Sequence, residues 1–192
     1  MDTSRRDWRQ GLPQLSRGPV RLREVDVSDV SALMAFLTTP DTARFIPPPP
    51  TTVEGFEAFI RAMHDGRAAG RIACFVVLPP DSDVADGIMS LRVPAAHPVS
   101  SEGPWNFGFV FGRHTWGTGR FESAARLMLE FAFREMDLPR VEAWSSLPNG
   151  RAHGALAKLG AEPALMKDVD APDGRHGHFI CWTIRRDRHE GR

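Results

Sequence analysis

The stretch WNFGFVFGRHTWGTGRFESAARLMLEFAFREM, residues 105–136, decides the fold of this 192-residue chain. Its first part is aromatic and β-prone, which predicts a strand over 105–111. A short loop with two glycines follows this strand. Apolar residues then cover so much of the circumference of a helix over about 120–136 that we expect this helix at the centre of the domain.

The glycine loop is a candidate phosphate-binding turn. Gly117 and Gly119 allow the main chain to approach a ligand closely, and a helix that begins near Arg120 directs free N–H groups and positive potential to the same point. The alternative is a turn that binds nothing. Walker and dinucleotide motifs do not match, because the loop lacks Gly-Lys-Ser/Thr and Glu122 occupies the position of the third glycine of the dinucleotide fingerprint.

A second motif, NGRAHGALAKLGA at residues 149–161, follows a strand predicted over 141–145. Asn149 can cap a short helix that ends at Gly160. The two motifs together resemble the GNAT superfamily of acyltransferases, in its Gln/Arg-x-x-Gly-x-Gly/Ala cofactor loop and its Asn-x-x-Ser/Ala…Leu-x-Lys-Leu-Gly helix. The resemblance covers about residues 19–186, and WGTG at 116–119 is similar to the branch of ribosomal-protein-alanine N-acetyltransferases.

The resemblance implies a site for acetyl-CoA. In this family the loop and the start of the helix bind the pyrophosphate. The corresponding residues here are Trp116, Gly117, Thr118, Gly119, Arg120 and Phe121.

The resemblance also implies that the strand before the loop splays from its neighbour at a bulge and that its free edge pairs with the pantetheine arm. This edge would be Phe109, Val110 and Phe111, and a main-chain N–H there would bind the developing oxyanion. Asn149 would hydrogen-bond the same arm. The alternatives are that Asn149 is a plain N-cap and that the phenylalanines belong to the core.

The catalytic residues that the resemblance implies are incomplete in this chain. The family's frequent general acid is a tyrosine, and the chain contains none. The carboxylate that often serves as general base aligns with Asn106, which can orient a water or an amine but cannot take its proton. Ser145 could donate a hydrogen bond, and His97 and Glu102 are candidate bases by pKa range only. We expect no metal site, because no carboxylate stands at ligand spacing from the histidines.

The remaining pattern predicts a single α/β (α+β) domain, with a mixed, mostly antiparallel sheet of about six to seven strands flanked by about four helices. Further strands are expected over 20–25, 71–78, 87–93 and 178–184. We expect the domain to span 19–186, between a polar N-terminal arm (1–18) and a charged tail (187–192). Residues 1–18 fit either a flexible arm or an added crossing segment.

The composition excludes several classes of protein. The 24 basic residues balance 24 acidic ones, which argues against a nucleic-acid binder that acts by uniform charge. No apolar run is long enough to cross a membrane or to form a secretory core, so a cytoplasmic protein without a membrane partner is expected. Two distant cysteines exclude a disulfide scaffold. A homodimer is left open.

These observations predict an N-acetyltransferase that moves the acetyl group of acetyl-CoA directly to a primary amine, either a peptide or protein N-terminus or a small amine. No metal is needed. The alternative is a CoA-binding module of the same fold with little or no catalysis, which the missing tyrosine and carboxylate favour. The loops around 40–55 and 94–105 are apolar with few charges, which favours a peptide N-terminus or a small hydrophobic amine over a polycationic acceptor.

Overall fold

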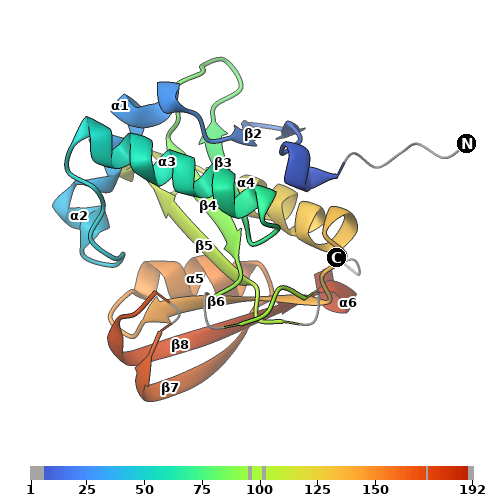
Figure 1. Cartoon of the computed structure of the whole chain (residues 1–192). Helices are drawn as coiled ribbons and strands as arrows, with labels where there is room; N and C mark the ends of the chain where they lie inside the picture. Colours follow the sequence, from blue (N-terminus) through green and yellow to red (C-terminus); the bar gives the residue numbers. More distant parts are fainter. Residues whose placement is uncertain (1–6, 95–96, 101–102, 172, 190–192) are drawn as a thin grey trace, which may run out of the picture.

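The computed structural model describes residues 7–94, 97–100, 103–171 and 173–189. This part of the chain forms an eight-stranded sheet in the order β1-β2-β3-β4-β5-β6-β8-β7, with helices packed against it (Figure 1). Neighbouring strands pair antiparallel except β5 and β6, which run parallel. The predicted mixed, mostly antiparallel domain is confirmed, with more strands than the expected six to seven and more α-helices than the expected four.

The elements have the following bounds. The strands are β1 (Leu15–Arg17), β2 (Val20–Glu24), β3 (Ile72–Leu78), β4 (Gly87–Arg92), β5 (Asn106–Phe111), β6 (Arg140–Ser146), β7 (Glu162–Asp170) and β8 (His176–Arg185). The α-helices are α1 (Val30–Leu37), α2 (Pro40–Ala43), α3 (Val53–Ala68), α4 (Arg120–Glu130), α5 (Gly150–Lys158) and α6 (Arg186–His189). Short turns of 3-10 helix are η1 (Trp8–Gln10), η2 (Val27–Asp29) and η3 (Arg113–Thr115), and a π-helical turn, η4 (Phe131–Glu135), continues α4.

Two strands, β1 and β7, have no counterpart in the predicted elements. Both lie at an edge of the sheet, where one side of the strand has no partner strand. β1 has only three residues, and most side chains of β7 are exposed, so neither shows an alternation of buried and exposed positions. Pro163 near the start of β7 is tolerated because an edge strand need not donate every N–H.

The described part of the N-terminal segment packs on the domain. The Trp8 ring is buried and contacts Trp105 and Phe131 edge to face, with ring centroids 6.3 and 6.5 Å away. Arg67 of α3 donates a hydrogen bond to the carbonyl of Arg9. The boundaries of the arm, the domain and the tail remain predictions.

The sheet separates two apolar cores. Along β3, Ala73, Phe75 and Val77 point into the core that contains the buried face of α4, whereas Cys74, Val76 and Leu78 point into the core beneath α1 and α3. A strand buried on both faces reads as a continuous apolar run, as 72–78 does. The long apolar helix expected over 120–136 is α4 with its π-helical continuation.

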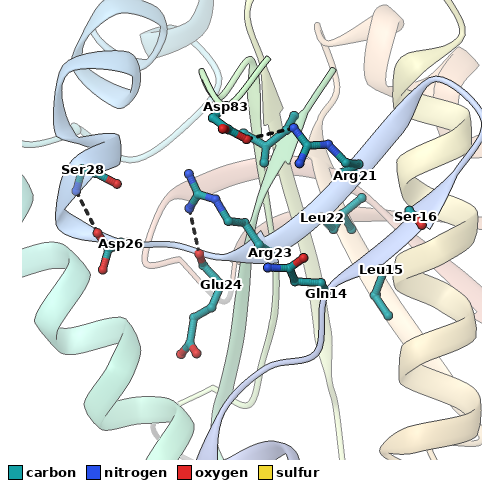
Figure 2. A pocket seen from close by; sticks show the side chains of 11 residues that line it. Gln14, Leu15, Ser16, Arg21, Leu22, Arg23, Glu24, Asp26, Ser28 and Asp83 are labelled. Atoms are coloured by element: carbon teal, nitrogen blue, oxygen red, sulfur yellow. Dashed lines mark hydrogen bonds and ion pairs between the residues drawn. The ribbon is translucent and has the colours of Figure 1, made fainter. Parts of the chain in front are cut away.

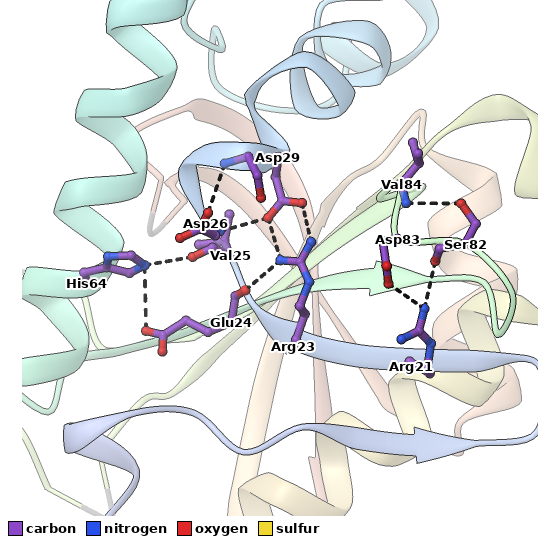
Figure 3. A network of polar contacts seen from close by, with 11 residues as sticks. Arg21, Arg23, Glu24, Val25, Asp26, Asp29, His64, Ser82, Asp83 and Val84 are labelled. Atoms are coloured by element: carbon purple, nitrogen blue, oxygen red, sulfur yellow. Dashed lines mark hydrogen bonds and ion pairs between the residues drawn. The ribbon is translucent and has the colours of Figure 1, made fainter.

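A buried ion pair joins β2 to the start of α1 (Figure 3). The Asp29 carboxylate, 2% exposed, accepts hydrogen bonds from both terminal nitrogens of Arg23 at 2.8 Å and from the Asp26 N–H at 2.8 Å. Asp26 accepts from the Ser28 N–H at 3.0 Å, which lowers the pKa of the Asp26 carboxyl. These bonds form a capping box that fixes the turn from strand to helix.

We expect Asp29→Ala to lower the free energy of unfolding by about 3 kcal/mol or more, because it leaves the Arg23 guanidinium without its buried partner. Asp83→Ala is the matched control. Asp83 pairs with Arg21 of the same strand, but its side chain is 88% exposed, so its loss should cost less than about 1 kcal/mol. Urea denaturation of both variants measures the difference, and equal costs would contradict this account.

Candidate active site

The parallel strands β5 and β6 are paired at one position and then separate. Asn106 is in register with Glu142, whose N–H donates to the Trp105 carbonyl at 2.8 Å. No further pairing joins β5 to β6, although the structure describes both strands completely. Figure 1 shows the two strands diverging from this point. The splayed strand that the family resemblance implies is therefore present, but the expected bulge is not, since β5 keeps a continuous register on β4 from Asn106 to Phe111.

The register of β5 on β4 determines which main-chain groups face the gap. The Gly112 N–H donates to the Asp86 carbonyl at 2.9 Å, and Val110 lies opposite Ile88. Because bonding alternates along an antiparallel pair, Val110 is bonded to β4 while the main-chain groups of Phe109 and Phe111 point into the gap. The free edge therefore presents the N–H groups of Phe109 and Phe111 and the Phe109 carbonyl to an extended ligand, whereas the Phe111 carbonyl accepts a hydrogen bond from the Trp116 indole at 3.2 Å.

A cavity of about 530 Å³ fills this gap. Of the twelve residues predicted from the sequence, eight line it: Phe109, Val110, Phe111, Trp116, Gly117, Gly119, Phe121 and Asn149. The other lining residues come from α2 and the segment after it, from Thr115, and from α4 and α5.

The glycine loop forms one end of this cavity. Gly117 and Gly119 have φ values of +79° and +81°, the left-handed region that favours glycine. A Cβ at either position would meet no protein atom within 4 Å, so the space above both glycines is open. Gly119 is the N-cap of α4 and has no side chain to cap the helix, which leaves first-turn N–H groups for an anion.

The side chains of Thr118 and Arg120 do not line the cavity. The Thr118 hydroxyl donates to the Thr115 carbonyl at 2.6 Å. The Arg120 guanidinium is paired with Asp86, a carboxylate that is 4% exposed and lies 4.0 Å from His114. Burial raises the pKa of the Asp86 carboxyl, although the charges of Arg120 and His114 oppose the rise. The Arg120 main-chain N–H makes one long hydrogen bond, 3.5 Å, to the Thr118 hydroxyl.

Two positively charged side chains line this cavity that were not predicted from the sequence. The Arg151 guanidinium stacks on the Trp116 ring, 3.5 Å from its centroid, and Lys158 lies farther along α5. Neither forms an ion pair within the described residues, whereas the two lining carboxylates, Asp41 and Glu122, are paired with other arginines. The available charge is therefore positive. The Leu-x-Lys-Leu-Gly motif contains Lys158, but nothing in the sequence singles out Arg151.

Asn149 caps α5 and lines the cavity at the same time. Its Oδ1 accepts a hydrogen bond from the Ala152 N–H at 3.2 Å, as the plain N-cap alternative requires. The amide group of Asn149 still has two N–H donors. The cap and a ligand contact are therefore compatible.

The two predicted catalytic residues lie on opposite faces of the sheet. Asn106 is opposite Arg92 on β4, and its Oδ1 is buried without a hydrogen-bond partner among the described residues. Ser145 is buried on the face toward α5, where its hydroxyl accepts from the Trp182 indole at 3.0 Å. Of the two other candidate bases, His97 is exposed and Glu102 lies outside the described residues.

A second cavity, of about 360 Å³, meets the first at β5. The two share Ile46, Phe109 and Val110. The walls of the second cavity are apolar, with Pro47–Pro50 on one side and α3 on another. Gly108 opens its floor: this residue is exposed although it lies in the middle of a central strand, and a Cβ there would lie 3.1 Å from the Ser90 Oγ.

A third cavity, of about 570 Å³, lies beside β1 and β2, and β3 and β4 separate it from β5 (Figure 2). It contains none of the predicted site residues. Its arginines, Arg21 and Arg23, are bonded to neighbouring acidic groups and main-chain carbonyls. The two cavities at β5 are therefore the candidate active site.

A family model described as the acetyltransferase (GNAT) domain matches residues 20–162. The uncharacterized N-acetyltransferase p20 of Bacillus licheniformis is 22% identical over 173 residues, 88% of this chain and 94% of that protein.

Two solved structures share the fold. One, a ribosomal-protein-S5-alanine acetyltransferase from Vibrio fischeri, has a TM-score of 0.76 at 18% identity, over 91% of this chain and 97% of that chain. The other, RimL, a ribosomal L7/L12 α-N-protein acetyltransferase in complex with coenzyme A, has a TM-score of 0.77 at 14% identity, over 91% of this chain and 99% of that chain.

Since the family model covers most of the chain, the protein belongs to the GNAT acetyltransferase family and is an acyltransferase. The family predicted from the two motifs is confirmed, and its structural neighbours include the expected ribosomal-protein acetyltransferases. Within the described residues, no three His, Cys, Asp or Glu side chains are grouped to hold a metal ion. None of the described helices is long and apolar enough to span a membrane.

We expect Gly119→Val to weaken CoA binding by about 100-fold, because the side chain would occupy the open space above the loop and displace several charge-assisted hydrogen bonds. Gly174→Val is the matched control. Gly174 has nearly the same φ, +83°, and the same open space around a Cβ, but lies outside the cavity. Isothermal titration with CoA and thermal unfolding of both variants separate ligand contact from strain. Equal CoA affinities would show that the loop is only a turn.

Proposed function

We propose that this protein transfers the acetyl group of acetyl-CoA directly to a primary amine. The observation that carries the proposal is the meeting of two cavities at the free edge of β5. The first cavity has a glycine loop at the N-terminus of α4 and an extended main-chain edge, which suit CoA. The second is a separate entrance to the same edge, which suits an acceptor.

The first cavity fits the parts of CoA in order. The pyrophosphate would lie at residues 116–121, where first-turn N–H groups and the α4 dipole favour an anion. The pantetheine arm would extend along Phe109 to Phe111 as an additional strand, with Asn149 on its other side. A free N–H of Phe109 or Phe111 would bind the thioester carbonyl oxygen and the charge that develops on it.

The transfer requires no acyl-enzyme. The amine nitrogen forms a bond to the thioester carbonyl carbon, the C–S bond breaks, and CoA leaves as a thiolate that takes up a proton. Burial raises the pKa of the Cys74 thiol to about 12, and burial with the nearby Glu142 raises that of Cys181 to about 12. Both thiols are protonated at neutral pH and are poor nucleophiles, which supports direct attack by the amine.

Asn106 is the candidate positioning residue for the amine. Its buried Oδ1 has no partner among the described residues, and leaving such an acceptor unpaired is costly. Asn106 lines neither cavity, so a water between its Oδ1 and the attacking amine would satisfy it. Ser145 can donate one hydrogen bond, but it lies on the opposite face of the sheet. Neither residue can remove a proton, so water is the proton acceptor in this scheme.

The second candidate function is a CoA-binding module with little catalysis. The observation that favours it is that the side chains lining the junction of the two cavities, Ile46, Phe109 and Val110, include no acid or base. Release of free thiol from acetyl-CoA, followed with a panel of amines and peptides, distinguishes the two. Tight CoA binding without thiol release on any acceptor would establish the module.

We expect kcat/KM to rise with pH toward the pKa of the acceptor amine, about 10, because water and not an enzyme group takes the proton.

Asn106→Ala should lower kcat about tenfold, by the loss of one hydrogen bond, and leave CoA affinity unchanged. Thiol-release rates over pH 6 to about 10, with CoA titrations of both proteins, provide the measurement. A bell-shaped profile with two enzyme pKa values would contradict this proton path.

A further inference from the structure

The second cavity has an apolar body and one charged end. Four consecutive prolines and the side chains of Phe56, Phe59 and Met63 form much of its wall. Among its lining residues Arg92 is the only one with a charged side chain. A cavity of about 360 Å³ is at the small end of the usual range for ligand pockets, which suits a small molecule.

The Arg92 guanidinium is free to bind a ligand. It forms no hydrogen bond or ion pair within the described residues, and its side chain is exposed. Glu142 lies on the same face two strands away, and its carboxylate contacts the Cys181 Sγ at 3.9 Å. An arginine offers five N–H donors in a planar fork that matches a carboxylate.

Arg92 lies close enough to the junction of the two cavities for one small acceptor to reach both. The cavities meet at Phe109, which is in register with Met89, and Arg92 is three positions (89 to 92) farther along β4. This corresponds to about 10 Å along the strand. The Arg92 side chain can extend toward the junction of the cavities and shorten this distance. One small molecule can therefore place its carboxylate at Arg92 and its amine at the thioester.

We propose that the acceptor is a small apolar primary amine that carries a carboxylate, as an apolar amino acid does, and that Arg92 binds this carboxylate. The proposal rests on the proposed acetyl transfer and names the substrate class of the same site. The apolar body packs on the prolines and α3, the carboxylate pairs with Arg92, and the amine points to the free edge of β5. Ser90, beside Gly108 on the floor, offers one further hydroxyl to the carboxylate.

A peptide N-terminus fits these features less well. Its first carboxylate lies on an acidic side chain or at a distant C-terminus, so an apolar peptide would leave Arg92 unpaired at the end of the cavity. Peptides therefore form a separate arm of the test.

Matched acceptors test the proposal. Thiol release from acetyl-CoA is measured with phenylalanine, phenylalanine amide and phenethylamine, with leucine and 3-methylbutylamine, and with a peptide that begins with an apolar residue. Each assay uses the parent protein, Arg92→Gln, Arg92→Lys and Arg140→Gln. Arg140 is an exposed strand arginine on β6 that lines none of the three cavities. Isothermal titration with CoA accompanies each protein.

We expect the parent to prefer each carboxylated amine over its partner by about 10- to 100-fold in kcat/KM, the range for a charge-assisted hydrogen-bonded pair. Arg92→Gln should abolish this preference and leave the uncharged amines and CoA affinity unchanged. Arg92→Lys should restore part of the preference, and Arg140→Gln should behave as the parent.

Two results would overturn the proposal, and they are distinguishable. If uncharged amines or peptides are acetylated as well as or better than the carboxylated amines, or if Arg92→Gln lowers all rates equally, the substrate class is wrong and acetyl transfer stands. If CoA binds but no acceptor releases thiol, the proposed acetyl transfer fails, and the acceptor class fails with it.

Discussion

The active site depends on a single strand pairing, between Asn106 and Glu142. If β5 and β6 stayed paired along their length, the main-chain groups of Phe109 and Phe111 would be satisfied by β6 and the first cavity would not exist. Because the strands separate after one position, the edge of a central strand stays open inside the domain. Main-chain N–H and carbonyl groups without a strand partner need a hydrogen bond from a ligand or from water. An unpaired edge inside a domain is therefore a candidate binding site.

Two helices follow the strands at their open end. The glycine loop and α4 follow β5, α5 follows β6, and the first turns of both helices line the first cavity. The Trp116 ring joins the two sides, since its indole N–H donates to the Phe111 carbonyl at 3.2 Å and its face carries the Arg151 guanidinium. The same arrangement supplies open main chain and positive charge, the two features that a pantetheine phosphate ester requires.

The sequence predicts the glycine loop and the Asn149 cap better than it predicts the arginines and edge strands around them. The loop at 116–121 and the cap at Asn149 have strong local signals, because glycine and asparagine at these points serve backbone geometry. Arg151 and Arg92 carry no such signal, since their importance comes from tertiary neighbours, a stacked ring in one case and an apolar cavity in the other. The edge strands β1 and β7 show no alternation of buried and exposed residues, because solvent surrounds much of each strand. Asn106 and Ser145, both predicted as catalytic, lie on opposite faces of the sheet, which the sequence does not reveal.

The central claim, that the free edge of β5 binds the pantetheine arm, is tested most directly by amide hydrogen exchange measured by NMR with and without CoA. The account predicts that the Phe109 amide exchanges fast in the free protein and slows on CoA binding, while the Val110 amide, bonded to β4, is slow in both states. A Phe109 amide that is already protected without CoA, or that is unchanged by saturating CoA, would contradict it.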